Sequence, residues 1–280
     1  MNKGPELNLG SVTVNWLHGG DNMLDGGAMF GAVPKVLWSK KCSVDENNCM
    51  ELVNNPLLVQ TRNANLIIDT GLGNKLTEKQ LKIFRVTRQW AVTEELPRFG
   101  LSPEDIDLVV FTHGDFDHAG GAVMQVETGE LVPAFPQARY IIQKKEWEDI
   151  CSPIERTKHT YFAHNFAALA DRGLLEPVDG DVDLLPEIKV RHSGGHTRGH
   201  QIVEISGKRG RAVHLGDLFA THYHSSPLWV MAYDNFPLEV IERKKRFFAD
   251  YGKDCWFTFY HDPGMRACRL DANYQIMDSM

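Results

Sequence analysis

The sequence predicts a mixed α/β fold in a single domain that spans residues 1–280. Three observations carry this prediction. Short apolar runs typical of strands alternate with longer amphipathic stretches in both halves of the chain. No Pro/Ser-rich linker and no short-period repeat divides it. With 280 residues, 42% of them hydrophobic and 24% charged, the chain can bury a large core of its own.

Strands are expected where apolar residues run together and end at polar or glycine-rich positions. These runs lie at 11–17, 57–61, 65–69, 106–112, 139–143, 188–192, 201–206, 211–215 and 256–260. Helices are expected where apolar residues recur every three or four positions, at 77–84, 92–99, 144–151, 158–170 and 238–251. The basic run at 243–246 belongs to the last of these helices, where we expect a solvated face.

Charge and composition narrow the class of partner. The formal net charge is -7, so no basic excess is present to neutralise phosphates, and no nucleic-acid partner is expected. No stretch has the roughly eighteen successive apolar residues of a membrane span, and no N-terminal signal pattern is visible, so a cytoplasmic protein without a membrane partner is expected. Five cysteines without a CxxC pair indicate reduced thiols. A small-molecule substrate is the expected partner, and a homodimer is compatible with the sequence.

The segment THGDFDH at 112–118 places four potential metal ligands directly after the apolar run at 107–111. These ligands are His113, Asp115, Asp117 and His118, which we expect on a loop at a strand end. Imidazole and carboxylate together suit zinc, iron or manganese. Their spacing is too tight for one tetrahedral ion to use all four easily, so two neighbouring ions are indicated. The alternative is a polar surface loop.

Three later segments supply further ligands for a two-metal centre. They are GGHTRGH at 194–200 with His196, HLGD at 214–217 with Asp217, and FYHDP at 259–263 with His261. Flanking glycines let the backbone approach a metal closely, and a carboxylate has two oxygens with which to bridge two cations. Each segment alone is weak evidence for a metal site, because a lone histidine beside a strand more often has a structural role. Together they predict a metal site.

The ordered set THGDFDH, GGHTRGH, HLGD and FYHDP resembles the metallo-β-lactamase superfamily, and LIIDTG at 66–71 resembles its strand-to-turn element. The resemblance spans most of the chain, from about Leu66 to Pro263. Within the superfamily, DGGAMFG at 25–31 with Pro34 and Lys35, and PLWVMAYD at 227–234, resemble the branch that contains N-acyl homoserine lactone lactonases. The resemblance implies a four-layer αββα sandwich, which the pattern alone would leave as mixed α and β.

The resemblance also implies how the ligands divide. It places His113, Asp115 and His196 on metal 1, Asp117, His118 and His261 on metal 2, and Asp217 between them as a bridge. It implies a solvent-derived hydroxide between the ions, which Asp117 helps to orient. Asp115 departs from the family pattern, which has histidine there. A carboxylate makes the site harder and shifts its preference toward iron or manganese relative to zinc.

The group that protonates the leaving group is missing from its family position. The resemblance implies a tyrosine three residues after the bridging aspartate, but that position is Ala220. His222, Tyr223 and His224 are the nearby substitutes. Asp69 is expected either to orient a metal-binding histidine or to form a turn, and His200 and His214 are interpreted as supporting residues. Five apolar residues are candidates either for an acyl-chain pocket or for the core: Met29, Phe30, Trp38, Trp229 and Met231.

These features predict a dinuclear metal-dependent hydrolase that opens a lactone or small ester, with N-acyl homoserine lactones as the leading substrates. Three alternatives stay open. One is a phosphodiester or phosphotriester hydrolase. Another, motivated by Asp115, is a diiron redox protein that uses an external flavin partner. The last is a non-catalytic sensor that retains the metal site.

Overall fold

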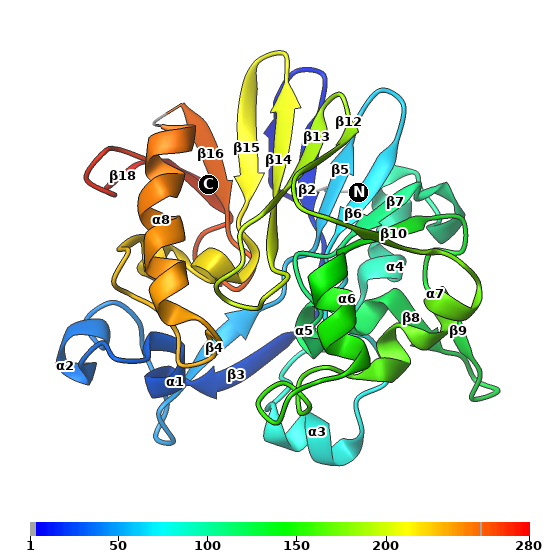
Figure 1. Cartoon of the computed structure of the whole chain (residues 1–280), viewed down its shortest axis with the longest axis horizontal. Coiled ribbons are helices and arrows are strands. Elements are labelled where there is room, and N and C mark those ends of the chain that lie inside the picture. Colours follow the sequence, from blue (N-terminus) through cyan, green and yellow to red (C-terminus); the bar gives the residue numbers. More distant parts are fainter. Residues whose placement is uncertain (1–3, 253) are drawn as a thin grey trace.

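A computed structural model describes residues 4–252 and 254–280. Two seven-stranded sheets pack face to face. Helix α8 (Pro237–Tyr251) covers the outer face of one sheet, while α6 (Lys144–Cys151) and α7 (Ala167–Asp171) lie on the opposite side of the molecule, against the other sheet (Figure 1). This arrangement is the four-layer αββα sandwich and confirms the expected fold class.

The first sheet is mixed. Its order is β1 (Glu6–Asn8), β2 (Thr13–Trp16), β5 (Leu57–Gln60), β6 (Asn65–Ile68), β7 (Leu108–Val110), β10 (Arg139–Gln143) and β11 (Leu175–Val178). The strands from β1 to β6 pair antiparallel, whereas β6, β7, β10 and β11 run parallel. Pro177 lies in the edge strand β11, where a residue without an N–H is tolerated.

The second sheet is antiparallel apart from one pair. Its order is β12 (Val182–Leu185), β13 (Ile188–His192), β14 (Gln201–Gly207), β15 (Gly210–His214), β16 (Cys255–Thr258), β17 (Ala267–Leu270) and β18 (Ile276–Ser279). Strands β15 and β16 pair parallel. A parallel pair needs a crossover connection, and helix α8 lies within it.

Successive side chains of a strand pack into two different cores, one on each face of the sheet. In β5, Leu57 and Val59 belong to the core between the two sheets, together with Val190 and Val203 of the second sheet. Leu58 points the other way, into the core between the first sheet and its helices. Because successive side chains of a strand point to opposite faces, apolar residues on both faces require a buried sheet with covering layers on each side.

The remaining elements lie outside the two large sheets. They are β3 (Asp21–Asp25), β4 (Cys49–Val53), β8 (Val123–Gln125), β9 (Leu131–Pro133), α1 (Gly26–Phe30), α2 (Lys35–Trp38), α3 (Glu78–Ile83), α4 (Val92–Glu95) and α5 (Phe116–Ala119). Strands β3 and β4 pair as a separate antiparallel ribbon. The sequence analysis missed this ribbon because its strands read DNMLD and CMELV, with few β-branched residues and no long apolar run.

Two sequence expectations about helices are corrected. The helix expected at 158–170 begins only with a 3₁₀ turn at Ala163–Asn165 and continues as α7. Tyr161, which precedes this turn, is not helical, and the Tyr161 hydroxyl donates a hydrogen bond to the Glu146 carboxylate at 2.7 Å. In α8 the basic run is not wholly solvated: Lys244 is buried, and its Nζ donates to the carbonyls of His224 (3.1 Å) and Trp229 (2.7 Å).

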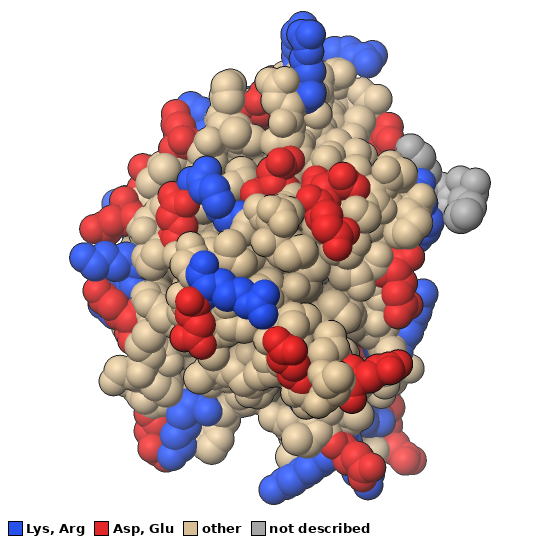
Figure 2. Space-filling model, turned by 90° about the vertical axis from the view of Figure 1, so that its right-hand side faces the viewer, with Lys and Arg blue, Asp and Glu red and all other residues tan. Residues whose placement is uncertain are grey.

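Acidic and basic side chains are interspersed on the face shown in Figure 2, and among the described residues neither sign forms a continuous stripe there. Within residues 4–252 and 254–280, no helix is long and apolar enough to cross a membrane. All five cysteines are free thiols, and Cys255 and Cys268 are buried.

Candidate metal centre

The potential ligands predicted from the sequence come from segments that follow four strands. The first segment follows β7, and the others follow β13, β15 and β16. Asp117 and His118 do not lie on a loop as expected. They belong to the short helix α5, which begins after Asp115 because the carbonyl of Asp115 accepts from the N–H groups of His118 (3.0 Å) and Ala119 (2.9 Å). This turn brings side chains that are close in sequence around one point.

The structure brings all seven predicted ligands together: six form two groups of three, and Asp217 lies between those groups. The first donor group is His113, Asp115 and His196, and the second donor group is Asp117, His118 and His261. Within each group the ligand atoms lie within 4.8 Å of one another. In the first, Asp115 Oδ2 lies 3.4 Å from His113 Nε2 and 3.5 Å from His196 Nε2. In the second, His261 Nε2 lies 3.1 Å from His118 Nε2.

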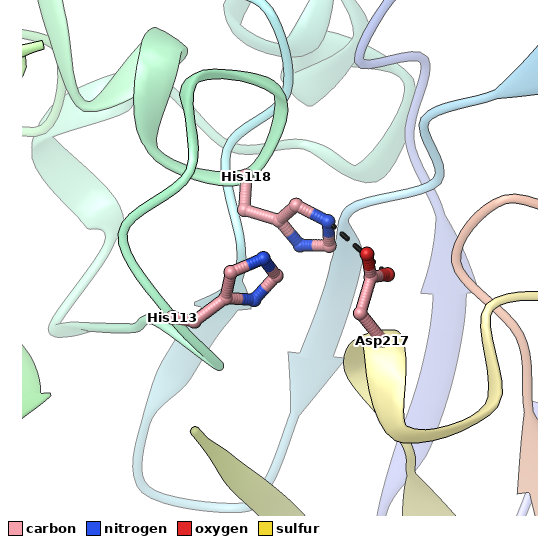
Figure 3. Close-up of side chains that lie close together, drawn as sticks. All are labelled: His113, His118 and Asp217. Carbon is pink, nitrogen blue, oxygen red and sulfur yellow. Dashed lines mark ion pairs between the residues drawn. The ribbon is translucent and has the colours of Figure 1, made fainter. Parts of the chain in front are cut away.

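Asp217 lies between the two donor groups. Its Oδ2 is 3.4 Å from His196 Nε2, while its Oδ1 is 3.4 Å from His118 Nε2 and 3.2 Å from His261 Nε2. Figure 3 shows the rings of His113 and His118 and the carboxylate of Asp217 facing a common space. One oxygen toward each group is the arrangement that a bridging carboxylate needs. The assignment of the seven residues as ligands stays a prediction.

The chemistry of this cluster fits divalent cations. Among the buried side-chain atoms without a hydrogen-bond partner in the described chain are His113 Nε2, His196 Nε2 and Asp217 Oδ1. Unsatisfied buried polar atoms are costly and rare, so atoms that converge on one space indicate a missing positive partner. Imidazole and carboxylate ligands also suit first-row divalent metals.

The pKa shifts of the clustered side chains also indicate a cation site. Burial alone would lower the pKa of His118, but the carboxylates of Asp217 and Asp69 outweigh burial and raise it well above its usual value. Burial would likewise raise the pKa of Asp217, but the imidazoles of His261, His118 and His196 hold it well below its usual range. The cluster therefore favours positive charge strongly, as a cation site must.

The Nδ1 atoms of His118 and His261 contact groups outside the cluster, so their Nε2 atoms face its centre. His118 Nδ1 lies 2.9 Å from Asp69 Oδ2, and His261 Nδ1 lies 3.2 Å from the carbonyl oxygen of Val53. Asp69 also accepts from the Thr112 N–H at 2.7 Å, and its backbone has a positive φ of 54°. Such partners fix the tautomer and the ring orientation of a metal-binding histidine. Of its two expected roles, Asp69 takes the orienting one.

Asp234 is an orienting residue that the sequence analysis missed. Its Oδ1 lies 2.9 Å from His196 Nδ1, and its Oδ2 accepts from the Met231 N–H at 2.8 Å. The residue lies in the segment at 227–234, but no spacing rule connects it to His196 across 38 positions. Only a sequence pattern around position 234 could have raised it as a candidate.

His200 and His214 support the site as expected. His200 is buried, and its Nε2 accepts from the Asp217 N–H at 3.1 Å while its Nδ1 lies 2.6 Å from Ser193 Oγ. Burial, followed by the charges of His113 and His196, lowers the pKa of His200 well below its usual value, so its ring stays neutral and can accept. His214 Nδ1 lies 2.9 Å from Thr258 Oγ1.

A cavity of about 620 Å³ opens onto the cluster, and Asp115, Asp117, Asp217, His196 and His261 form part of its wall. Its apolar lining comes largely from the β3–β4 ribbon and from α3: Met23, Leu24, Leu52, Ile83 and Phe84. Of the five apolar candidates, Met29 and Met231 line the cavity. Phe30 and Trp38 stack in the core behind it with ring centroids 5.0 Å apart, and Trp229 packs edge-on against Phe30.

The substitutes for the missing tyrosine are not on the cavity wall among the described residues. His224 is buried, and both its ring nitrogens are engaged, Nδ1 with Thr221 Oγ1 at 2.9 Å and Nε2 with the Met29 carbonyl at 2.8 Å. His222 Nδ1 is bonded to Asp262. Tyr223 packs against the ring of His222, with centroids 3.9 Å apart. These contacts direct the three side chains to partners away from the cavity wall, and their role as proton donors stays a prediction.

Tyr233 is the tyrosine on the cavity wall. Its hydroxyl has no hydrogen-bond partner within residues 4–252 and 254–280, and the residue is 39% exposed. Burial, with smaller contributions from the carboxylates of Asp25 and Asp117, raises the pKa of Tyr233 to about 12. The phenol therefore stays protonated at neutral pH and can donate a hydrogen bond into the cavity.

Two packed sheets with a cluster of histidines and aspartates at their strand ends define a metal-dependent hydrolase. The sequence model of the Metallo-beta-lactamase superfamily matches residues 50–231, and the chain belongs to that superfamily. A probable metal-dependent hydrolase from Staphylococcus aureus is 39% identical, with a TM-score of 0.91 over 98% of each chain.

More distant relatives carry specific names. An N-acyl homoserine lactonase from Bacillus thuringiensis is 24% identical over 180 residues, which cover 59% of this chain and 64% of that protein. A probable metallo-hydrolase from Mycobacterium tuberculosis is 27% identical over 188 residues, covering 61% and 57%. These matches span less than two thirds of the relatives' length. AidC, a dizinc quorum-quenching lactonase solved with a product, shares the fold at a TM-score of 0.79 and 19% identity over 99% of this chain and 96% of its own.

Proposed function

We propose that this superfamily hydrolase uses two divalent ions to open a lactone or a small ester, with N-acyl homoserine lactones as the first substrates to test. One observation carries the proposal: two donor groups share Asp217 at the wall of a cavity that is otherwise largely apolar. The names of the lactonase relatives support the choice of substrate.

In this proposal the first donor group would hold metal 1, the second would hold metal 2, and Asp217 would contribute an oxygen to each. Bound there, the two ions would lower the pKa of a shared water and polarise the substrate carbonyl. Asp117 reaches the cavity wall, where its carboxylate would orient the attacking water. The identity of the ions is open between zinc, iron and manganese.

The other residues of the cavity bind the substrate. The apolar side chains of the β3–β4 ribbon and of α3 accept an acyl chain and exclude water around it. Tyr233 donates a hydrogen bond to the developing alkoxide or to the acyl carbonyl. A lactone needs little help with its leaving group, because the alkoxide remains tethered to the product, so a tyrosine from another segment can replace the one absent at Ala220.

A direct test combines metal analysis with a substrate screen. Protein purified without added metal is assayed for zinc, iron and manganese, and then for acid release from short- and long-chain homoserine lactones and from aryl esters. Hydrolysis should stop on chelation and return with added metal. Metal-loaded protein that cleaves phosphotriesters but leaves lactones and esters untouched would favour the phosphoesterase alternative instead.

Tyr233→Phe is expected to lower kcat for lactone hydrolysis by about 100-fold, at the low end of what a positioned proton donor contributes. Its metal content should not change, because the hydroxyl touches none of the seven ligands. The matched control is Tyr223→Phe, which removes a hydroxyl outside the cavity wall and should leave kcat at the parent value. A lower kcat in Tyr223→Phe together with an unchanged kcat in Tyr233→Phe would instead assign the proton donor to Tyr223.

Asp115→His is expected to raise the fraction of zinc relative to iron and manganese, because imidazole replaces a hard carboxylate. The measurement is the metal ratio in parent and variant grown in the same medium. Asp25→His, which changes another carboxylate of the cavity lining outside both donor groups, is the control. An unchanged ratio in Asp115→His would mean that Asp115 is not a ligand.

A further inference from the structure

Glu146 is a fully buried carboxylate that the proposed chemistry does not use. It lies in the first turn of α6 with 0% exposure. Among the described residues no lysine or arginine pairs with it. A buried carboxylate without a cation is tolerated only when several hydrogen bonds satisfy it. Its partners therefore show what the residue holds in place.

Four donors saturate this carboxylate, two on each oxygen. Oε1 accepts from the Gly114 N–H at 2.8 Å and from the Tyr161 hydroxyl at 2.7 Å. Oε2 accepts from the Thr197 hydroxyl at 2.7 Å and from the Gly199 N–H at 3.1 Å. One side chain thus ties together two loops that are more than eighty positions apart in the sequence, as the numbers of Gly114 and Gly199 show.

Close backbone packing holds the same contact. A Cβ atom on Gly199 would lie 2.3 Å from the backbone nitrogen of Glu146, and one on Gly114 would lie 2.5 Å from Cδ1 of Ile150. A side chain at position 199 would therefore push its loop away from α6, whereas one at position 114 would require the end of the Ile150 side chain to move. The helix, the two glycines and the carboxylate form one interlocked contact.

The two loops carry the first donor group. Gly114 lies between His113 and Asp115, and Thr197 directly follows His196. The second donor group has supports of its own: Asp69 holds His118, and the carbonyl of Val53 holds His261. Asp69 also accepts from the N–H of Thr112, which precedes His113. None of the hydrogen bonds of Glu146 reaches the second donor group.

We propose that Glu146 is a positioning residue for metal 1: its carboxylate fixes the loop of His113 and Asp115 against the loop of His196, so that this site is preformed. The inference rests on the dinuclear site of the proposed function, though not on its substrate. Nearby, burial followed by the carboxylates of Glu146 and Asp115 raises the pKa of Tyr161, so that its phenol remains a donor. Glu146 also adds negative charge beside the metal 1 site.

Glu146→Gln tests the proposal with almost no change in volume. In either orientation of the amide, its NH₂ group meets one backbone N–H, of Gly114 or of Gly199, so one of the two loops loses its acceptor. The dissociation constant of metal 1 should rise by about 10- to 100-fold, as for other residues that orient metal ligands, while that of metal 2 stays at the parent value. The readout is titration of metal-free protein with zinc by calorimetry, with zinc content measured after dialysis against a weak chelator.

A second pair of variants identifies which ion is lost. His261→Ala should retain metal 1, and the double variant His261→Ala/Glu146→Gln should lose that ion as well at the same chelator concentration. Tyr161→Phe removes one donor but leaves both loops bonded to the carboxylate, so it should bind both ions nearly as the parent does. If Glu146→Gln does not fold, Thr197→Val removes one of the two hydrogen bonds to Oε2 and should weaken metal 1 in the same direction.

Tyr140→Phe separates positioning from general stability. Its hydroxyl is equally buried and bonds to the Phe135 N–H at 3.0 Å and its carbonyl at 3.1 Å, without touching either metal loop. The positioning role would be overturned if Glu146→Gln bound both ions with the affinities of the parent. It would also be overturned if both ions bound equally more weakly, as in a Tyr140→Phe protein that is merely destabilised. Neither outcome would affect the proposed function. A parent protein that binds no divalent ion would overturn both.

Discussion

Asp217→Ala is expected to lose both metal ions and to lower kcat/KM for the best substrate by about 1000-fold or more, since in the proposed mechanism the ions would supply the nucleophile. The reason is geometric, because Asp217 directs one oxygen to each donor group, at 3.4 Å from His196 and at 3.2 Å from His261. Without this carboxylate, only two anionic ligands among four neutral imidazoles would remain to offset the charge of two divalent cations. Metal analysis after gel filtration, together with steady-state kinetics, checks the result.

His261→Ala is the control for this prediction, because His261 belongs to the second donor group alone. It should empty mainly metal 2 and leave about one ion per chain, as expected when a single ligand of one site is removed. The folded state of each variant is verified by circular dichroism before metal analysis. Full occupancy of both sites in Asp217→Ala would remove the bridging assignment.

In the parent protein, the free energy of unfolding is expected to rise between pH 8 and 10.5. Lys244→Met is expected to abolish this rise. Burial lowers the pKa of Lys244 from 10.5 to about 8. In that window the folded state has released a proton that the unfolded state still binds, so stability increases with pH and the penalty of the buried charge disappears. The full difference is about 3 kcal/mol, from roughly 1.4 kcal/mol for each pKa unit. Below pH 8 both states are protonated and this contribution is constant.

Urea unfolding at pH 7.5 and at pH 10 measures this difference in parent and variant. Lys245→Met is the matched control, because Lys245 lies beside Lys244 on α8 but is exposed and pairs with Glu242 at 2.8 Å. This control should keep the pH dependence of the parent. The same dependence in Lys244→Met would mean that other groups produce it.

The fold was predictable to the extent that strands and helices could be recognised locally. The strand at Arg139–Gln143, the strand at Ile188–His192 and the helix at Lys144–Cys151 have the boundaries expected from their apolar pattern. The β3–β4 ribbon was not predicted because its short strands contain few β-branched residues and no long apolar run, although Met50 and Leu52 are buried. That omission matters because the ribbon supplies much of the cavity's apolar lining.

By itself, the sequence determined the kind of site. Histidines and aspartates spaced closely after strands have few roles other than metal binding, and their order along the chain resembles one superfamily. The predicted ligands can therefore be named from short local motifs. The superfamily and the αββα architecture followed from the same motifs and are confirmed by the family match and the two packed sheets.

Only the tertiary structure decided which residues support and surround that site. Asp234 reaches His196, and Glu146 joins Gly114 to Gly199, through contacts between segments far apart in the chain. Tyr233 rather than Tyr223 lines the cavity, although Tyr223 is nearer to Asp217 in sequence. The physical reason is that side-chain direction and long-range hydrogen bonding depend on how the elements pack, and no local spacing encodes that packing.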